Sequence, residues 1–411
     1  MPSPIISRDP KTLAADPSFL GYVCQFIDPP KSSGLLPTPD WIPPDGSRLH
    51  PAFPTRKFTT FAQPDRTPIT RHFETVKKTM PDGQDVEFWG FFDPKIPGNS
   101  YKFPSDEIRL VEGQIFHGLL GGIKKKAHTI HWHGIEPTSQ NDGVGKLSME
   151  VGGEYIYQWL ASAAGTYFYH CHRNTLLHFE FGMYGMLLID PLPPPRKDPA
   201  IPFPPYPAGG PGYVRRANTV VKYDKEAVWV LDDVDPLWHL LDHDAAMSSC
   251  DNLNLDANGN PVGVNFTSGG GLNVFNPAYF CISGVPHPWT RNLPTDPVNP
   301  GVAVQVKAGK TLLIRLLCGA YSLNKCVMEG LNAEVIAMDG RVLGQPPFTK
   351  YSRPFTISAG VPFNLTAARR FDLLISPTAA QIGTHRFVVE FQHHVTRQVM
   401  GIAETFVNVV P

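Results

Sequence analysis

The chain has 411 residues, with 36 basic and 37 acidic side chains and a formal net charge of −1 at pH 7. This balance, without a long basic run, argues against nucleic acid or an anionic membrane surface as a partner. No apolar run is long enough to cross a bilayer, so no membrane span is predicted. The length predicts two or three domains, each able to bury a substantial core.

Residues 1–75 are rich in proline and turn residues, as in Asp28-Pro29-Pro30 and Trp41-Ile42-Pro43-Pro44. The chain holds 43 prolines, about twice the usual share, which is typical of loop-rich β proteins with rigid connections. We interpret residues 1–75 as a proline-rich arm packed on the first domain, with a partly disordered tail as the alternative. The segment lacks the basic, apolar and small-residue succession of a secretory signal.

Residues 76–191 contain short strand patterns separated by turn residues such as Pro81-Asp82-Gly83 and Asn141-Asp142-Gly143. Strand spacing of this kind indicates an all-β domain built as a β-sandwich. The predicted strands are Val86–Phe92, Glu107–Leu110, His128–Ile135, Tyr155–Leu160, Thr166–Cys171 and Gly185–Ile189. We expect one short helical turn within residues 173–182, which carries His178 back toward Cys171.

Residues 192–212 form a proline-rich linker that ends at Gly209-Gly210, and we place the domain boundary there. Residues 213–411 are interpreted as a second, mainly structural β-sandwich, with an insertion at about 233–300. We expect Trp238, His239, His243, His287 and Trp289 of this insertion to be structural or surface residues. The predicted strands are Ala227–Leu231, Ala303–Val306, Thr311–Leu317, Ala333–Ala337, Phe371–Ile375 and His385–Phe391.

Two histidine-rich stretches, 127–134 and 165–172, carry the chemistry of the first domain. In each stretch two histidines alternate with another residue: His131 with His133, and His170 with His172. Residues two apart point to the same face of a β-strand, so two neighbouring strands would direct four imidazoles to one place. Cys171 lies between two of these histidines and therefore points to the opposite face. The backbone at Cys171 would then connect two metal sites.

The second metal site is predicted from ligand chemistry. A thiolate, two imidazoles and a distant thioether select copper in a trigonal electron-transfer site. Cys171, His178 and Met183 follow one another at short spacing, and His128 can supply the second imidazole. A single histidine on an apolar strand is usually a core residue, but the full set of motifs in one stretch predicts copper binding.

These motifs resemble the multicopper oxidase family. The similar segments are Pro81-Asp82-Gly83, Ile108–Gly113, His131–Pro137, Asn141-Asp142-Gly143, Gly165-Thr166-Tyr167 and His170-Cys171-His172. The resemblance implies two cupredoxin-like Greek-key domains. It also implies a type 1 copper that takes electrons from a small-molecule donor, and a cluster of type 2 and type 3 copper that reduces dioxygen. It suggests a proton-delivery role for Asp142, although a plain turn role for Asp-Gly fits equally well.

The chain departs from the common three-domain members of that family, because His128, Cys171, His178 and Met183 put a complete type 1 set in the first domain. This resembles copper nitrite reductases and some two-domain oxidases. Two residues more than usual separate Cys171 from His178. We therefore predict a laccase-like copper oxidoreductase whose donor reacts near an exposed edge of His178. The alternatives are a nitrite-reductase-like enzyme with a single type 2 copper and a non-catalytic electron carrier.

The two domains form an internal repeat in which Gly134 matches Gly330 and Gly165-Thr166 matches Gly383-Thr384. In this register the second domain has no counterpart for the histidines of the first. His128, His131 and His133 correspond to Asn324, Val327 and Glu329, and His170, Cys171 and His172 to Val388, Val389 and Glu390. We interpret Glu329 and Glu390 as charged strand residues rather than metal ligands.

The repeat leaves too few histidines for a trinuclear copper centre, which takes eight in the family, whereas this first domain offers four. We therefore expect a homo-oligomer. A head-to-tail trimer is favoured, with His393 or His394 of a neighbouring second domain facing the site. A two-fold dimer that joins two four-histidine faces is possible, and so is a smaller site with one copper.

The chain has six cysteines. With Cys171 assigned to copper, Cys250 with Cys281 and Cys318 with Cys326 are candidate disulfides, and buried thiols are the alternative. Dioxygen-reducing copper enzymes are usually exported, so we expect a periplasmic or extracellular protein whose signal is not present in this chain.

Overall fold

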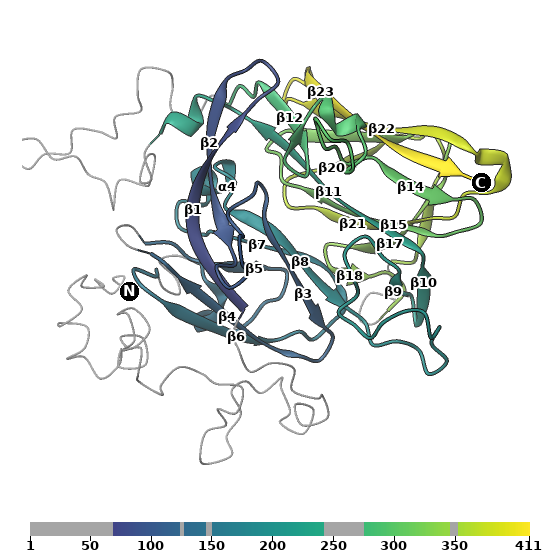
Figure 1. The fold of residues 1–411 in the computed structure, drawn as a ribbon, viewed down its shortest axis with the longest axis horizontal. Helices are drawn as coiled ribbons and strands as arrows, with labels where there is room; N and C mark the ends of the chain where they lie inside the picture. The colour runs from purple at the N-terminus through teal and green to yellow at the C-terminus, as the bar shows by residue number, and fades with distance from the viewer. Residues whose placement is uncertain (1–68, 124–126, 145–149, 242–274, 346–351) are drawn as a thin grey trace, which may run out of the picture.

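The computed structural model describes residues 69–123, 127–144, 150–241, 275–345 and 352–411. Strands dominate this part of the chain, and the helices are short (Figure 1). The expected all-β fold is confirmed. Most of the predicted N-terminal arm lies outside the described residues. The remainder, from Ile69 onward, belongs to the first long strand, so the predicted boundary at residue 75 falls inside a strand.

The first domain is a sandwich of two four-stranded sheets. One sheet has the order β2-β1-β4-β6, with β1 at Ile69–Thr79, β2 at Asp85–Phe92, β4 at Ile115–Gly121 and β6 at Tyr155–Leu160. The other has the order β3-β8-β7-β5, with β3 at Ser105–Val111, β5 at His131–His133, β7 at Gly165–His170 and β8 at Tyr184–Asp190. Two short helices, α3 at Ser139–Asp142 and α4 at Thr175–Glu180, lie in its loops.

Every residue of β7 and β8 is buried, because their sheet is covered on both faces. On one face, Tyr167 and Tyr169 of β7 belong to the core of the first domain. On the other face, Phe168 packs with Tyr184, Met186 and side chains of the second domain. Successive side chains of β7 thus alternate between the core of the first domain and the interface with the second.

The second domain is a larger sandwich. Its first sheet has the order β13-β12-β11-β15-β21-β17-β18, with β19 paired to β17. The bounds are β11 Lys225–Val234, β12 Tyr279–Ile282, β13 Val285–Pro286, β15 Leu312–Cys318, β17 Ala333–Met338, β18 Arg341–Val342, β19 Phe355–Ile357 and β21 Arg370–Ile375. Its core is formed by aliphatic and aromatic residues between this sheet and the next.

The facing sheet of the second domain has the order β14-β23-β22-β16-β20. The bounds are β14 Val304–Lys307, β16 Leu323–Met328, β20 Phe363–Leu365, β22 Gly383–Gln392 and β23 Val399–Val410. A separate hairpin joins β9, Gly212–Arg216, to β10, Thr219–Tyr223. Short 3-10 helices are η3 at Trp238–Leu240, η5 at Trp289–Arg291 and η7 at Ala379–Gln381.

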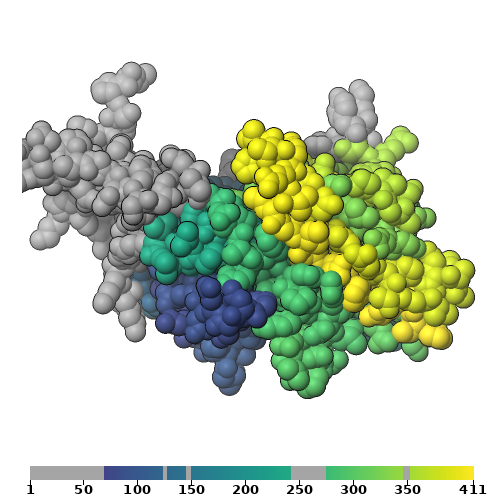
Figure 2. Space-filling model, turned by 90° about the horizontal axis from the view of Figure 1, so that it is seen from above, coloured from purple at the N-terminus to yellow at the C-terminus, as the bar shows by residue number. Residues whose placement is uncertain are grey.

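The interface between the domains is apolar at one end and charged at the other. Figure 2 shows the β1–β2 hairpin, in purple, against the green surface of the second domain, where the Tyr279 hydroxyl donates to Asp82 at 2.9 Å. Deeper in the interface, the Arg315 guanidinium is 1% exposed and lies 2.8 Å from Glu226 and 3.4 Å from Asp190 of the first domain. Arg109 of the first domain also pairs with Glu226. Because a buried charge is costly when unpaired, this network ties the two domains together.

The predicted strands all occur, with small differences at their ends. The predicted strand His128–Ile135 is the main exception, since only His131–His133 forms a strand and His128 makes an isolated bridge to Val151. Several strands were not predicted, among them β1, β4, β16 and β23. In β4 the pattern is obscured by Gly118, whose missing side chain leaves room for the rings of Phe116 and Trp132.

Candidate metal centres

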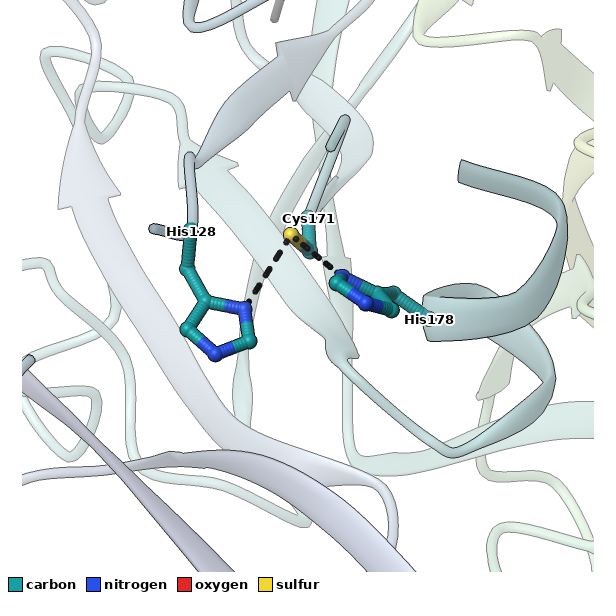
Figure 3. Close-up of side chains that lie close together, drawn as sticks. All are labelled: His128, Cys171 and His178. Carbon is teal, nitrogen blue, oxygen red and sulfur yellow. Dashed lines mark hydrogen bonds between the residues drawn. The ribbon is translucent and has the colours of Figure 1, made fainter. Parts of the chain in front are cut away.

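The first candidate centre consists of His128, Cys171 and His178, which converge in the interior of the first domain (Figure 3). The Cys171 sulfur lies 3.3 Å from Nδ1 of His178 and 3.7 Å from Nδ1 of His128. All three residues are at most 2% exposed. They come from three separate elements: the bridge before β5, the end of β7 and the helix α4.

The chain between Cys171 and Met183 is closed by backbone hydrogen bonds. Met183 accepts from the Cys171 amide at 2.9 Å and donates to the His178 carbonyl at 3.0 Å. Asn174, with φ at +48°, turns the chain into α4, which is the helical turn expected from the sequence. The extra length before His178 is thus taken up by a turn and a helix, while Met183 stays fully buried in the same core cluster as Cys171.

Aromatic rings enclose this centre. Phe73 stacks on His128 with ring centroids 4.5 Å apart, and Trp89 lies 5.7 Å from His178. His178 is 0% exposed. The expectation that a donor meets an exposed edge of His178 is therefore wrong, because α4 turns this imidazole inward and Trp89 packs against it.

Burial raises the pKa of Cys171 to about 11. A thiolate at neutral pH would then need a cation beside it, and a metal ion supplies that charge. One sulfur and two imidazole nitrogens form a donor set that suits copper. The residues present therefore fit a type 1 copper, and Met183 lies on the same loop as a possible axial donor.

The second candidate centre is a group of four imidazoles, two from β5, one from the last residue of β7 and one from His172 just beyond it. The ring of His131 lies 5.6 Å from His133, 5.1 Å from His170 and 5.2 Å from His172. Ligand atoms of His131, His133 and His170 all lie within 4.8 Å of one another. His172 stacks on His170 with ring centroids 5.6 Å apart. The alternation predicted from the sequence brings these four side chains together.

Backbone carbonyls fix the tautomers of two of these imidazoles. Nδ1 of His131 lies 2.8 Å from the Asp142 carbonyl, and Nδ1 of His170 lies 2.9 Å from the Cys171 carbonyl. Since a carbonyl only accepts, each Nδ1 carries the proton and leaves Nε2 with a free lone pair for a metal. The Asp142 carboxylate also lies 3.1 Å from His131. Asp142 thus orients a candidate ligand directly.

Burial favours the neutral form of His133, His170 and His172, which is the form that binds a metal. It lowers the pKa of His170 well below its usual value, and the neighbouring His131 adds to the effect. For His133 burial is again the main cause, with Arg370 of the second domain next, and the pKa falls to about 3.

The other sequence candidates do not form metal sites in the described part of the chain. Only the two groups above bring three possible ligands together there. Glu329 pairs with Arg386 at 3.6 Å and Glu390 with Lys325 at 3.1 Å, as expected for charged strand residues. His239 donates to the Glu87 carbonyl at 2.6 Å and packs as a structural residue, whereas His243 lies outside the described residues.

The proposed pairing of Cys318 with Cys326 is wrong. Cys281, Cys318 and Cys326 are buried free thiols, and the Cys318 thiol donates to the Asn324 side chain at 3.1 Å. Cys250, the proposed partner of Cys281, lies outside the described residues. Hydrophobic surroundings account for these cysteines without a covalent bond.

Sequence reasoning missed a cavity of about 640 Å³ beside His131 and His133. Its far wall comes from the second domain and includes Arg341, Arg369 and Arg370. No local pattern in the second domain distinguishes these arginines from surface residues. Their role depends on how the two domains pack.

Comparison with known proteins finds a family match for the segment that carries these side chains. The multicopper oxidase family description matches residues 98–194. An L-ascorbate oxidase from Cucumis sativus is 34% identical over 129 residues, which are 28% of this chain and 21% of that protein. The matched segment thus spans about a fifth of this curated relative. Copper is the cofactor that this family implies, and both groups of side chains could hold it.

Solved structures extend the fold similarity over most of the chain. The blue copper oxidase from Nitrosomonas europaea superposes with a TM-score of 0.54 at 18% identity and covers 83% of this chain and 85% of its own. The copper nitrite reductase from the same organism gives 0.51 at 16% identity, over 84% and 94% of the two chains. No helix of the described residues is long and apolar enough to span a membrane. Residues 98–194 thus match the multicopper oxidase family, and the chain has a fold similar to that of the Nitrosomonas blue copper oxidase.

Proposed function

We propose that this protein is a copper-dependent oxidoreductase of the multicopper oxidase type, which oxidises a small-molecule donor and reduces dioxygen. One observation carries the proposal. Cys171 belongs to the buried sulfur–imidazole group, while its neighbours His170 and His172 belong to the four-imidazole group. One residue thus connects a site suited to single-electron transfer with a site suited to a small ligand.

The ligands in this proposal are His128, Cys171, His178 and Met183 for type 1 copper. The paired histidines His131, His133, His170 and His172 would hold the copper cluster. Copper bound to these residues supplies one-electron redox chemistry and a place for dioxygen to bind. The chain's own residues orient the imidazoles and exclude water around Cys171, and the Asp142 carboxylate lies beside one of the imidazoles. This carboxylate lines the cavity and contacts His131, so it is placed to deliver protons.

The donor would not touch His178, because this imidazole has no exposed surface. Electrons would instead cross the shell of packed side chains, which includes Trp89 and Phe181. Donors of different structures could therefore reduce such a site, because no pocket around His178 has to match the shape of the donor.

The dioxygen site would be completed in a homo-oligomer. On the side of His131 and His133 that faces the cavity, the described residues of the chain's own second domain contribute arginines, Asp339 and alanines, but no histidine. A trimer is favoured and a dimer possible. His393 accepts hydrogen bonds at Nδ1 from the amides of Val395 and Thr396, so its proton is on Nε2 and would have to leave before Nε2 could bind a metal in a neighbour's site.

A nitrite-reductase-like reaction at a single copper is the second candidate. The type 1 set in the first domain and the fold shared with the Nitrosomonas nitrite reductase favour it. The multicopper oxidase match of residues 98–194 favours the oxidase.

We also propose that the protein acts in the periplasm or outside the cell.

Copper analysis and dioxygen uptake test the proposal together. The copper-loaded protein should consume dioxygen when supplied with a phenolic donor and should contain more than one copper per chain. Loading with copper but no dioxygen uptake, together with nitrite reduction, would establish the second candidate instead. If the fully loaded protein catalysed neither reaction, it would be interpreted as an electron carrier.

A further inference from the structure

The cavity between the domains has a charged wall that the oxidase proposal does not use. Three guanidinium groups, those of Arg341, Arg369 and Arg370, line it opposite His131 and His133. Arg369 is already engaged, since it pairs with Asp339 at 3.3 Å and lies over the Phe371 ring. Arg370 also lies over an aromatic ring, that of Phe168 at 5.3 Å, but its contact with the Asp339 carboxylate is longer, at 3.8 Å.

Arg370 is almost fully buried, with 4% of its side chain exposed. Nη1 donates to the Ala368 carbonyl at 2.6 Å and Nε to the Thr166 carbonyl at 3.4 Å. Among the described residues its nearest carboxylate is that of Asp339, 3.8 Å away, and Nη2 makes no hydrogen bond. Buried guanidinium groups are normally paired with an anion. This one presents a free edge to the cavity.

Arg341 reaches the same place from β18, which is separated from β21 by β17 in the same sheet. Its Nη2 donates to the Gly134 carbonyl at 3.4 Å. Its carboxylate partner, Glu136, lies 3.7 Å away and has 83% of its side chain exposed, so the pair is weak. Nη2 of Arg370 would lie 2.7 Å from a Cβ at Gly134, where φ is +90°. The two guanidinium groups thus meet at Gly134. Burial lowers the pKa of Arg370, and the charge of Arg341 lowers it further.

We propose that this cavity binds an organic carboxylate, held by Arg341 and Arg370. A planar carboxylate accepts two parallel hydrogen bonds from a guanidinium and would offset the repulsion between these two. The cavity volume of about 640 Å³ is in the range of small-molecule sites, and Pro137, Ala367 and Ala368 give it an apolar wall. The site is separate from the proposed electron path. Its occupant would lie beside His131 and His133 and restrict access to them.

Benzoate, which copper does not readily oxidise, is a suitable probe. Isothermal titration of the full, copper-loaded chain should show binding. Arg370→Gln and Arg341→Gln should each weaken it about tenfold or more, because a charge-assisted pair is lost. Arg370→Lys should give an intermediate affinity, since the charge remains but the planar fork is lost. The control Arg386→Gln removes an exposed arginine, paired with Glu404 and Glu329, that does not line the cavity, and it should bind like wild type.

Arg370 also supports the backbone, so near-ultraviolet circular dichroism must show that its variants are folded. Arg341 is 38% exposed and provides a test with less risk to folding. The same titration with copper-free protein separates the arginines from a metal as the anchor. Binding that needs copper and is unchanged in both glutamine variants would overturn the proposal, as would no binding to wild type. Either result leaves the oxidase proposal standing, because dioxygen uptake is measured separately.

Discussion

His131 on β5 lies directly opposite His170 on β7 in the antiparallel strand pair. In the second domain, Val327 lies opposite Val388 in the corresponding pair of β16 and β22. The internal repeat inferred from the glycines of the two domains predicted this correspondence, and the strand register confirms it. The corresponding pair of antiparallel strands therefore has two histidines opposite each other in the first domain and two valines in the second. Within the described residues, this difference leaves the first domain as the candidate copper domain.

Replacement of the buried thiol should remove the colour of the protein. We expect the copper-loaded wild type to be intensely blue, from charge transfer between the Cys171 sulfur and copper. Cys171→Ser should abolish the visible band while some copper remains at the paired histidines. The absorption spectrum and copper content are the measurements.

Cys326→Ser is the matched control, because it removes a buried thiol from the core of the second domain. It should keep the blue band. Circular dichroism must accompany both variants, since either change could disturb packing. A colourless wild type fully loaded with copper would contradict the assignment of Cys171.

The axial position can be tested on two methionines of one segment. Met183 lies in the core cluster with Cys171, whereas Met186 faces the second domain. Met183→Leu should keep the blue band and raise the reduction potential, because a weak donor to oxidised copper is lost. Met186→Leu should change neither. If a redox titration instead showed a raised potential for Met186→Leu and an unchanged potential for Met183→Leu, Met186 would be the ligand.

The arrangement of the histidines could be predicted from the sequence because it rests on local geometry. Side chains two apart share a strand face, so His170 and His172 had to separate from Cys171. The exposure of His178 could not be predicted in this way. It depends on Trp89, which is far away in the sequence and packs on the helix that carries His178. Local patterns report which way a side chain points, but not what a distant segment places over it.

The cysteines and the cavity show the same limit. Cys318 and Cys326 lie close in the sequence and were a plausible pair, yet both are free thiols in an apolar core. Arg341 and Arg370 are far from the histidine motifs, and only the packing of the two domains brings them to Gly134. Such relationships arise from tertiary structure rather than from spacing.

The buried charge network between the domains should contribute strongly to stability. Arg315→Met would leave Glu226, Asp190 and Asp372 without their central cation, which should cost about 3–5 kcal/mol. Arg216→Met is the control, because Arg216 is 44% exposed and pairs only with Glu334. It should cost about 0–1 kcal/mol. Urea denaturation of both variants checks this, and equal midpoints would contradict a special role for Arg315.

The last prediction concerns assembly. The described part of the chain brings four histidines together at β5 and β7, and its own second domain offers arginines on the cavity side. We therefore expect dioxygen reduction only in a homo-oligomer. In a trimer closed by a neighbour's second domain, His393→Ala or His394→Ala should remove cluster copper and spare the blue band. His385→Ala is the control, since His385 bonds the Gln381 carbonyl within its own domain.

A two-fold dimer gives a different result, because it joins two copies of the same histidine face. There His393→Ala and His394→Ala should be nearly silent, while His131→Ala or His133→Ala should remove copper from both halves of the cluster together. Light scattering at the assay concentration gives the oligomeric state, and copper content per chain separates the two arrangements. An active, fully loaded monomer would contradict both. It would require further ligands from the same chain, with His50, His72, His239, His243 and His287 as the residues to replace first.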